Sequence, residues 1–351
     1  MDKKIIFDIG HPAQVHQFSA LYKILSLNDW ECLFVAKDKE MAKYLLDYYQ
    51  FNYVILSKNR KGLFRKIIGA FKDYISFYLI IKKFRPQFIL HRFSLHASHI
   101  SKLFGITNIG FSDTEHASSL HKLTAPFIDI KLTGNSYNFP LGKNHIFFDG
   151  NIELFYLHRE IFNPNCDPYK VLNIKNGDSY CIVRFVSWEA HHDVGVNRMS
   201  AEDKKAIINF LLGKNYNVFI SSESELPEFF KKYELAAAPE YMHTILKYAD
   251  FYIGEGGTMA SEAAVLNTPA IYTNQLPLMG YLREEAEFNL LFHVHSYEEI
   301  KNLVENPPQP KFEEFMKKKI NATNFIAWFI ENYPESAKIM KENPNYQYRF
   351  K

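Results

Sequence analysis

The sequence predicts an α/β protein made of two parallel sheets, each covered by helices on both faces. Apolar runs of strand length alternate with longer stretches of helical periodicity, the pattern of strand–helix–strand units. The chain has 351 residues with 47% hydrophobic content, more than one ordinary core accommodates. Between residues 150 and 177 the alternation is lost and Asn and Pro collect. We therefore expect two domains joined near the middle of the chain.

The first half of the chain alternates in this way from its start. Its apolar runs are IIFDI, ECLFVA, YVILS, QFILH and TNIGF, and its helical stretches are 16–27, 41–49, 63–84 and 97–104. Arg85-Pro86 ends the third helical stretch, because the residue before a proline is disfavoured in a helix. These elements predict one Rossmann-like domain over residues 1–160.

The second half repeats the pattern after a linker at 161–178. Its strands are YCIVRFV, NVFIS and the run at 249–253, and its helices are 201–213 and 241–248. These elements predict a second Rossmann-like domain over residues 179–320. We expect helices within 312–343, and a C-terminal segment 321–351 that packs back on the first domain.

Bulk properties exclude several classes of protein. The formal net charge of +2 argues against a general nucleic-acid binder. Cys32, Cys166 and Cys181 are widely spaced, which favours neither a disulfide framework nor a metal cluster and fits a reducing compartment. No secretory signal is recognisable, and the longest apolar run, 75–81, is too short to span a membrane. We expect a cytoplasmic protein.

The segment YIGEGGTMASEAAVLNTPAIYT, residues 252–273, predicts a strand, a glycine turn, a helix and a strand. Gly256 and Gly257 allow close approach of the backbone, and Thr258 is expected to cap the helix. A helix start favours phosphate, and Glu262 lies one turn further on, where a carboxylate can bind ribose hydroxyls. The alternative is an ordinary turn with Glu262 on a solvated face. Glu255 would repel phosphate unless it points away.

Two histidines follow the first strand in DIGHPAQVHQF. His11 and His16 lie at the carboxyl edge of the sheet, where open α/β sheets bind ligands. Imidazole accepts protons near neutral pH, so either histidine is a candidate base. The alternative is that His11 is a turn residue and His16 a satisfied residue of a helix start.

A second polar cluster, FSDTEHA, follows a later strand of the same sheet. Asp113, Glu115 and His116 therefore reach the same edge, and carboxylates beside a histidine suit acid–base chemistry or recognition of sugar hydroxyls. The alternative is a loop capped by Asp113.

The second domain carries further polar residues after its strands. Arg184 at a strand end is a candidate diphosphate clamp. Consecutive His191, His192 and Asp193 cannot easily converge on one ion, so we expect no metal site. Ser187 joins Arg184 as a candidate, His191 and His192 are candidate acceptor contacts, and Ser221, Glu223 and His243 are candidates for the wall around the base.

The segment 58–85 is basic, aromatic and amphipathic. Nine Lys and Arg residues accompany a single Asp73, interleaved with apolar residues that include Phe71, Tyr74 and Phe77. Such a surface can bind anionic lipid headgroups. The alternative is that the apolar stripe belongs to the core.

Four segments, GHPAQVHQF, FSDTEHAS, RFVSWEAHHDVG and GEGGTMASEAAVLNTPAI, carry a resemblance to the GT-B glycosyltransferases. The chain looks closest to a bacterial and archaeal domain-of-unknown-function family of GT-B-like proteins. It is more remotely similar to the peptidoglycan N-acetylglucosaminyltransferase and to the non-hydrolysing UDP-N-acetylglucosamine 2-epimerases. The resemblance implies two domains that face a cleft.

The transferase resemblance implies that Glu262 holds the donor ribose, that residues 256–258 hold the diphosphate, and that His11 or His16 activates the acceptor hydroxyl. The loop GHPAQ departs from the glycine-flanked loop of the peptidoglycan enzyme, which leaves open which histidine is the base. The epimerase resemblance places Asp113 and Glu115 near acidic residues of that family.

These patterns together predict a metal-independent, inverting glycosyltransferase without a cofactor. It would move a sugar from a nucleotide sugar, with a UDP-sugar favoured by the resemblance, to a surface-polysaccharide or lipid-linked acceptor of the cell envelope. No Asp-x-Asp motif occurs, as expected if no divalent cation is needed. The alternatives are a nucleotide-sugar 2-epimerase and a non-catalytic nucleotide-sugar-binding protein.

Overall fold

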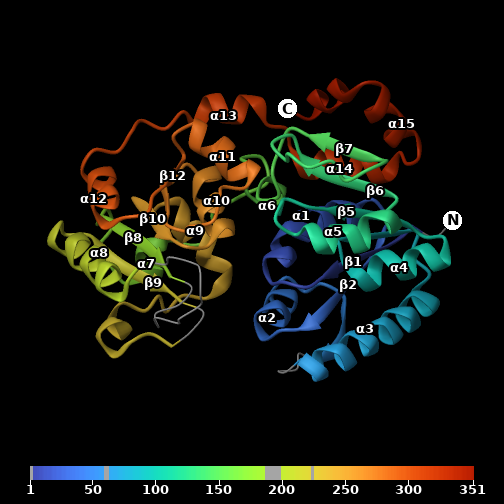
Figure 1. Ribbon diagram of the computed structural model, residues 1–351, viewed down its shortest axis with the longest axis horizontal. Coiled ribbons are helices and arrows are strands. Elements are labelled where there is room, and N and C mark those ends of the chain that lie inside the picture. Colours follow the sequence, from blue (N-terminus) through green and yellow to red (C-terminus); the bar gives the residue numbers. More distant parts are fainter. Residues whose placement is uncertain (1–2, 59–62, 186–198, 223–224) are drawn as a thin grey trace. The chain divides into compact units, whose positions relative to one another are not determined.

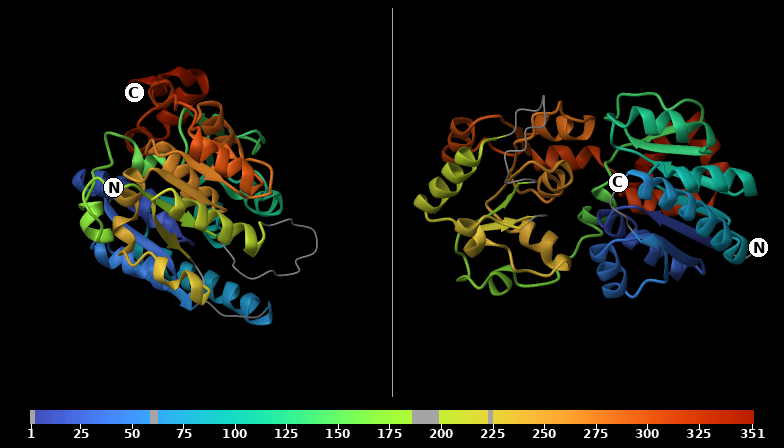
Figure 2. Two further views of the ribbon diagram at one scale, coloured as in Figure 1. Left: turned by 90° about the vertical axis from the view of Figure 1, so that its left-hand side faces the viewer. Right: turned by 60° about the horizontal axis from the view of Figure 1, so that its bottom comes forward.

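The chain forms two compact α/β units. The computed structural model describes residues 3–58, 63–185, 199–222 and 225–351, with the backbone alone described at 57, 58, 63–68 and 70. Unit 1 comprises residues 1–161 and 319–351, and unit 2 comprises residues 162–318 (Figure 1). Each unit contains one parallel sheet with helices on both faces, which confirms the predicted fold class (Figure 2).

Unit 1 is built on a seven-stranded parallel sheet in the order β3-β2-β1-β4-β5-β6-β7. Its strands are β1 Lys4–Ile9, β2 Glu31–Asp38, β3 Tyr53–Lys58, β4 Phe88–His91, β5 Thr107–Phe111, β6 Ile130–Gly134 and β7 His145–Phe148. The chain winds outward from β1 to β3, then returns to place β4 on the other side of β1. Open sheets bind ligands at such a reversal of strand order.

Helices cover both faces of this sheet because its central strands are apolar on both sides. Ile6 of β1 packs against Phe77 and Ile81 on one face, whereas the ring of Phe7 contacts that of Phe18 on the other, with centroids 5.4 Å apart. The helices of the unit are α1 Ala13–Leu27, α2 Glu40–Tyr48, α3 Leu63–Phe84, α4 Leu95–Phe104, α5 Ser118–Thr124, α6 Leu154–Leu157, α14 Ala322–Glu331 and α15 Glu335–Glu342.

The chain returns to unit 1 after residue 318. Helix α14 packs on α1 and α6, and the hydroxyl of Thr323 donates a hydrogen bond to the carbonyl of Phe155 (red in Figure 1). The side chain of Asn321 caps α14 and also donates to Glu160, 2.9 Å away. The final helices are thus part of the unit 1 core.

Unit 2 is built on a five-stranded parallel sheet in the order β12-β11-β10-β8-β9. Its strands are β8 Tyr180–Arg184, β9 Asn217–Ser221, β10 Phe251–Gly254, β11 Ala270–Tyr272 and β12 Leu291–His293. Its helices are α7 Pro168–Leu172, α8 Ala201–Gly213, α9 Met242–Lys247, α10 Gly257–Val265, α11 Gly280–Glu287, α12 Tyr297–Glu305 and α13 Phe312–Lys318. All of the expected linker 161–178 except its first residue falls within this unit, and it contains α7, which Asp167 caps.

Two helix predictions agree with the structure at both ends. The helix expected at 63–84 is α3, which ends where Arg85 adopts a positive φ of 55° before Pro86. The helix expected at 201–213 is α8, capped by the side chain of Ser200. These boundaries could be predicted from the sequence because the signals that begin or end a helix are local.

Helix α3 corrects the predicted lipid-binding face. Phe77 is fully buried in the sheet-facing core, and the hydroxyl of Tyr74 lies 2.7 Å from His99 Nδ1. Within residues 71–84, the exposed large apolar side chains are Phe71, Ile75, Tyr78 and Leu79. The sequence pattern is apolar on two sides, so it did not show which side faces the core. Within the described parts of the chain, no helix is long and apolar enough to cross a membrane.

Candidate functional site

The turn from β10 into α10 brings the backbone of two strands unusually close. A Cβ on Gly254 would lie 2.5 Å from the carbonyl oxygen of Arg184, so only glycine fits this position. The amide of Glu255 donates to the same carbonyl at 3.0 Å. The turn is therefore fixed against the carboxyl end of β8.

The helix after this turn begins earlier than the sequence suggested. Gly256 is the N-cap residue, with an extended backbone and no side-chain cap. Thr258 is an exposed residue of the first turn, so its predicted role as N-cap is wrong. A glycine can start a helix with backbone geometry alone, and the amides of the first turn of α10 form a helix start of the kind that binds anions.

Arg184 lies beside this helix start. Its Nη1 donates to Ser221 Oγ at 2.8 Å, across the carboxyl ends of the paired strands β8 and β9. Its Nε lies 4.0 Å from the position of a Cβ on Gly256. One guanidinium and one helix start thus lie at the same end of the sheet, a combination suited to a diphosphate.

Glu262 and His243 meet inside unit 2, although separate roles were predicted for them from the sequence. The Nε2 atom of His243 in α9 lies 3.2 Å from Glu262 Oε1, and both side chains are buried. Burial raises the pKa of Tyr252; the charge of Arg184 lowers it and that of Glu262 raises it further. The hydroxyl of Tyr252 therefore lies within electrostatic reach of the two groups expected to bind the donor.

Glu255 has a partner that the sequence did not indicate. Its Oε1 lies 2.9 Å from Nζ of Lys204 in α8, and both side chains are less than one-tenth exposed. The same Nζ lies 4.8 Å from the ring centroid of Phe185. Because Lys204 neutralises this carboxylate, Glu255 does not oppose an anion at the turn.

Four predicted site residues lie outside the described parts of the chain: Ser187, His191, His192 and Glu223. The contacts given above for Arg184, Ser221, His243 and Glu262 are contacts with other described residues of unit 2.

The two histidines after β1 have structural partners in unit 1. His11 is exposed, and its Nδ1 accepts a hydrogen bond from the amide of Ala13 at 3.2 Å. His16 is buried, with Nδ1 3.1 Å from the hydroxyl of Tyr49 and its ring stacked on that of Tyr156. The structure thus places His16 inside the helical layer and His11 on the surface.

The cluster after β5 does not converge on one point. Asp113 forms an ion pair with Arg92, which follows β4. Glu115 is buried and accepts from the amide of Asn138 at 2.9 Å, whereas His116 is exposed. Each of these neighbours in sequence has a different environment, so their predicted joint role in acid–base chemistry gains no geometric support.

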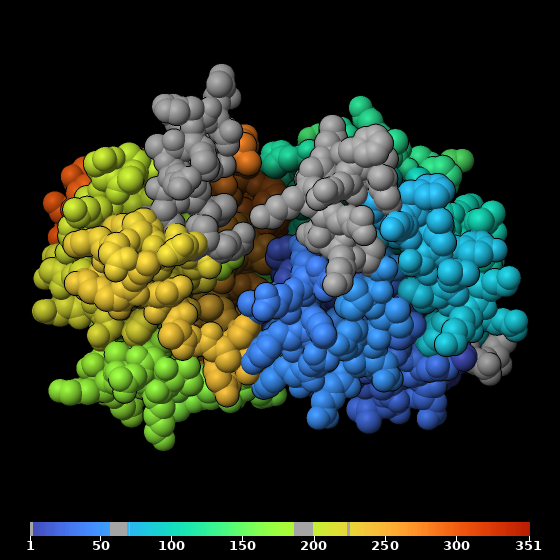
Figure 3. All heavy atoms as spheres, turned by 90° about the horizontal axis from the view of Figure 1, so that it is seen from below, coloured from blue at the N-terminus to red at the C-terminus, as the bar shows by residue number. Residues whose placement is uncertain are grey.

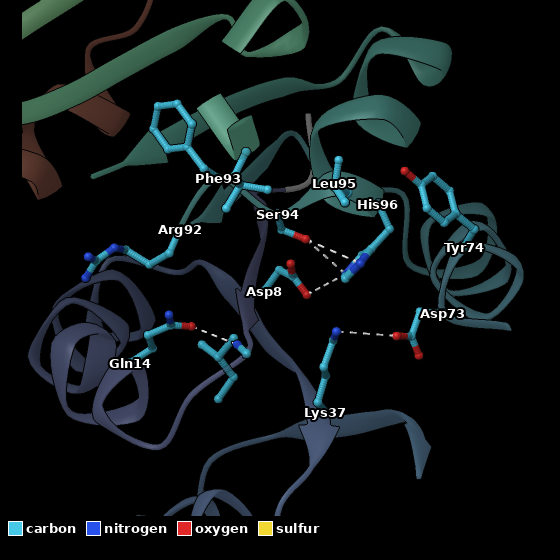
Figure 4. A pocket seen from close by; sticks show the side chains of 13 residues that line it. Asp8, Gln14, Lys37, Asp73, Tyr74, Arg92, Phe93, Ser94, Leu95 and His96 are labelled. Carbon is cyan, nitrogen blue, oxygen red and sulfur yellow. Dashed lines mark hydrogen bonds and ion pairs between the residues drawn. The ribbon is translucent and has the colours of Figure 1, made fainter. Parts of the chain in front are cut away.

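A pocket of about 250 Å³ opens at the reversal of strand order in unit 1, between the ends of β1 and β4 (Figure 4). Its polar lining comes from β1, β2, α3, the first turn of α1 and the segment from the end of β4 into α4. Residues that line it include Asp8, Lys37, Asp73, Tyr74, Ser94 and His96.

Two buried or partly buried ion pairs lie in this pocket. His96 Nε2 is 3.0 Å from Asp8 Oδ1, and Lys37 Nζ is 3.6 Å from Asp73 Oδ2. Sequence reasoning named none of Asp8, Lys37, Ser94 and His96 as site residues. The available signal was the charged Asp8 in an otherwise apolar strand, a position that calls for a buried partner.

Curated and solved proteins show which fold this is. An uncharacterized protein of Methanocaldococcus jannaschii is 25% identical over 320 residues, which cover 85% of this chain and 90% of that protein. A UDP-GlcNAc 2-epimerase of Neisseria meningitidis, solved with UDP-GlcNAc bound, is 14% identical to this chain and has a TM-score of 0.65. The match covers 97% of this chain and 98% of the epimerase chain. The glycosyltransferase SsfS6 of Streptomyces sp. SF2575 is 13% identical to this chain and has a TM-score of 0.55. The match covers 97% of this chain and 99% of the glycosyltransferase chain.

These likenesses confirm the predicted GT-B fold, since transferases and epimerases of that fold align with the chain over nearly its whole length. Below 25% identity they establish the fold alone. The sequence pattern of the family described as "Protein of unknown function (DUF354)" matches residues 3–323, and the chain belongs to that family.

Proposed function

We propose that this protein is a metal-independent, inverting glycosyltransferase that uses a nucleotide-sugar donor, with UDP-sugars favoured. The observation that carries the proposal is the arrangement at the end of β10, where Arg184 lies beside the start of α10 and the buried Glu262 lies within that helix. The helix start and the guanidinium would meet the charge of the diphosphate, and Glu262 would accept hydrogen bonds from ribose hydroxyls.

Transfer to an acceptor is favoured over 2-epimerisation by the environments of the acidic residues in unit 1. An epimerase needs two acid–base groups that flank one sugar carbon. Asp113 is paired with Arg92, whereas Glu115 accepts from the amide of Asn138, so the two carboxylates have separate environments and do not form such a flanking pair. A binding protein without catalysis remains the outcome expected if a donor binds but no product forms.

The donor half of the proposal is tested by thermal shift with UDP and a panel of nucleotide sugars. A ligand that binds only the native state raises the melting temperature. Glu262→Ala should weaken binding by about 100-fold or more, since two hydrogen bonds to a carboxylate each contribute roughly 1.5 kcal/mol or more. Glu287→Ala, at the exposed end of α11, is the matched control. Unchanged affinity of Glu262→Ala for every donor would sink the assignment.

The reaction class is tested by incubating the protein with a donor that binds. Release of UDP that rises when glycan or lipid-linked acceptors are added supports transfer. Formation of an epimer from the nucleotide sugar alone, with no acceptor, identifies the alternative enzyme.

We further propose that α3 binds an anionic membrane surface and that the protein meets its acceptor there. Phe71, Ile75 and Leu79 follow each other at intervals of four residues and are 68%, 48% and 56% exposed. Lys72, Lys82 and Lys83 are exposed on the same helix, while Asp73 is buried and paired with Lys37. In Figure 3, residues 71–84 of α3 belong to the light blue region of unit 1.

Residues 71–84 thus expose apolar and basic side chains but no acidic one. This combination is typical of a helix that lies at a membrane interface. Phe71→Ser with Leu79→Ser should abolish co-sedimentation with phosphatidylglycerol vesicles at low salt. Leu27→Ser, at an 84% exposed position in α1, controls for the loss of an exposed apolar side chain. Absence of wild-type binding at low salt would remove the membrane proposal and leave the transferase proposal intact.

A further inference from the structure

A buried contact between α9 and α10 joins the carboxylate proposed to bind ribose to a histidine. His243 is the second residue of α9, Glu262 lies in the second turn of α10, and the two helices pack on each other (Figure 1). Nε2 of His243 lies 3.2 Å from Oε1 of Glu262, and the side chains are only 9% and 7% exposed. The contact is therefore almost wholly shielded from water.

The direction of this hydrogen bond follows from the chemistry of its partners. An ionised carboxylate has no hydrogen to donate, so Nε2 of His243 carries the hydrogen and donates to Glu262. A carboxylate can accept about four hydrogen bonds. One bond from His243 therefore leaves capacity for two bonds from a ligand with neighbouring hydroxyl groups, such as the 2′ and 3′ hydroxyls of a ribose.

Buried hydroxyl groups hold the end of α9 in place, although this helix has only six residues. The hydroxyl of Tyr180 in β8 donates to the carbonyl of Ile245 at 2.7 Å. The hydroxyl of Thr268, in the loop after α10, donates to the carbonyl of Leu246 at 2.7 Å. The central sheet and the segment that follows α10 thus both fix the helix that carries the imidazole.

The start of α9 is held by a second set of hydrogen bonds. Thr244 Oγ1 donates to Asn165 Oδ1 at 2.8 Å and accepts from the amide of Asn165 at 3.1 Å. Nδ2 of the same asparagine donates to the carbonyl of Glu240 at 2.9 Å. Because α9 is tied down at both ends, its histidine is a rigid partner for the carboxylate, and rigid support of this kind preorganises a binding group.

We propose that His243 is a positioning residue that orients the Glu262 carboxylate toward both hydroxyls of the donor ribose, and that it thereby selects ribonucleotides over 2′-deoxyribonucleotides. This inference rests on the proposed transferase function and names the residue that sets the sugar preference of its donor site. The terminal torsion of a glutamate is broad, so a carboxylate without a buried donor turns easily. A nucleotide that lacks the 2′-hydroxyl leaves part of an oriented carboxylate unpaired, and a site built for a hydroxyl rejects such an analogue.

Helix α10 makes a second buried contact of the same kind, with α11 instead of α9. Oγ of Ser261 lies 2.5 Å from Oε1 of Glu285, and both residues are fully buried. This contact also joins a side-chain donor on one helix to a carboxylate on another. Ser261 directly precedes Glu262, so Ser261→Ala is a matched control that removes a buried hydrogen bond of α10 without touching His243.

The sugar preference is measured by calorimetric titration with UDP, ADP, GDP and CDP, each beside its 2′-deoxy counterpart. The wild type should bind its preferred ribonucleotide about 10- to 150-fold more tightly than the deoxy form, as expected for one hydrogen bond to a charged group. His243→Leu should lower this ratio by about tenfold. His243→Gln, which keeps a side-chain donor, should retain most of it. Ser261→Ala should keep the wild-type ratio while its melting temperature falls.

A kinetic comparison separates positioning from general damage to unit 2. It uses a donor and acceptor pair that supports release of the nucleotide by the wild type. His243→Leu should raise KM for the donor by about tenfold and change kcat much less, because the oriented carboxylate contacts the ribose equally in the ground state and in the transition state. A fall in kcat with an unchanged KM would contradict this role.

Failure of the proposed function is distinguishable from failure of the role given to His243. If no nucleotide binds the wild type, the proposed function fails, and the role of His243 falls with it. If ribonucleotides bind and Glu262→Ala weakens them, but His243→Leu keeps the wild-type ratio, only the role of His243 is overturned. Equal affinity of the wild type for both forms of its preferred nucleotide overturns it too. So does a loss of the ratio in Ser261→Ala as large as in His243→Leu.

Discussion

The two units hold their buried charges in different ways. In unit 2 the turn after β10 contains Glu255 and Lys204, here called the fixed pair, which joins a carboxylate to an ammonium group across 2.9 Å. In unit 1 the pocket contains Asp8 and His96, a pair that joins a carboxylate to an imidazole across 3.0 Å. The comparison teaches that each unit buries a carboxylate only beside a nitrogen base, and that the partner comes from a different element of the same unit in both cases.

The largest effect is expected from breaking the fixed pair. Lys204→Met leaves the carboxylate of Glu255 without its partner at 2.9 Å. Removal of one member of a buried pair costs about 3–5 kcal/mol of the free energy of unfolding, to be measured by urea denaturation. The double variant Lys204→Met with Glu255→Leu should recover most of that loss.

Lys231→Met is the surface control, because its carboxylate partners Glu225 and Glu228 are 85% and 88% exposed. It should leave the urea midpoint unchanged. An equal loss in the surface and the buried variant would contradict the distinction drawn between the two kinds of pair.

Acid should destabilise unit 1 through His91, the last residue of β4. Nδ1 accepts from the amide of Ser94, and Nε2 lies 3.2 Å from Asn108 Oδ1, so the ring is held neutral. Burial lowers the pKa of His91 from 6.5 to about 4, and the charge of Asp8 opposes this only in part. The unfolded chain therefore binds more protons between these two values.

The stabilisation from this neutral ring is complete above about pH 6.5 and is lost as the pH falls through about 4, a change of roughly 3 kcal/mol. His121, His145 and His158 have lowered pKa values through burial and contribute with the same sign. The difference between wild type and His91→Asn, measured by urea denaturation from pH 4 to 7, isolates the share of His91. Parallel stability curves for the two proteins would refute it.

A smaller loss is expected at the turn of unit 2 from Gly254→Ala. The added methyl would meet the Arg184 carbonyl and the Tyr252 hydroxyl, each 2.5 Å away. Overpacking of this kind costs typically ~1–3 kcal/mol of the free energy of unfolding, and the thermal shift by UDP should weaken as Arg184 moves. Gly213→Ala, where nothing lies within 4 Å, should be neutral or slightly stabilising.

The smallest effect is expected at the start of α4. Ser94→Ala removes the side-chain oxygen that accepts from the amide of Ala97, which costs about 1 kcal/mol of stability. The melting temperature checks this directly. A loss much greater than that would show that Ser94 also supports the packing of Asp8 and His96, which its hydroxyl contacts.

The sequence showed the site of unit 2 far better than that of unit 1, and the reason is distance along the chain. Gly254, Gly256 and Glu262 belong to one strand–turn–helix segment, so their spacing alone indicated a helix start for an anion. Asp8 and His96 are 88 residues apart. Nothing in local periodicity links a strand end to the first turn of a distant helix.

By itself the sequence determined the α/β class, the alternation of elements and the ends of helices such as α3 and α8, because these depend on local propensity and capping. Only the tertiary structure decided which polar groups meet: Glu255 with Lys204, Glu262 with His243, and Asp8 with His96. The same is true of α3, where packing on the sheet buries Phe77 and leaves Phe71 exposed. Buried charges must find partners, but the order of strands in the sheet selects which partner lies within reach.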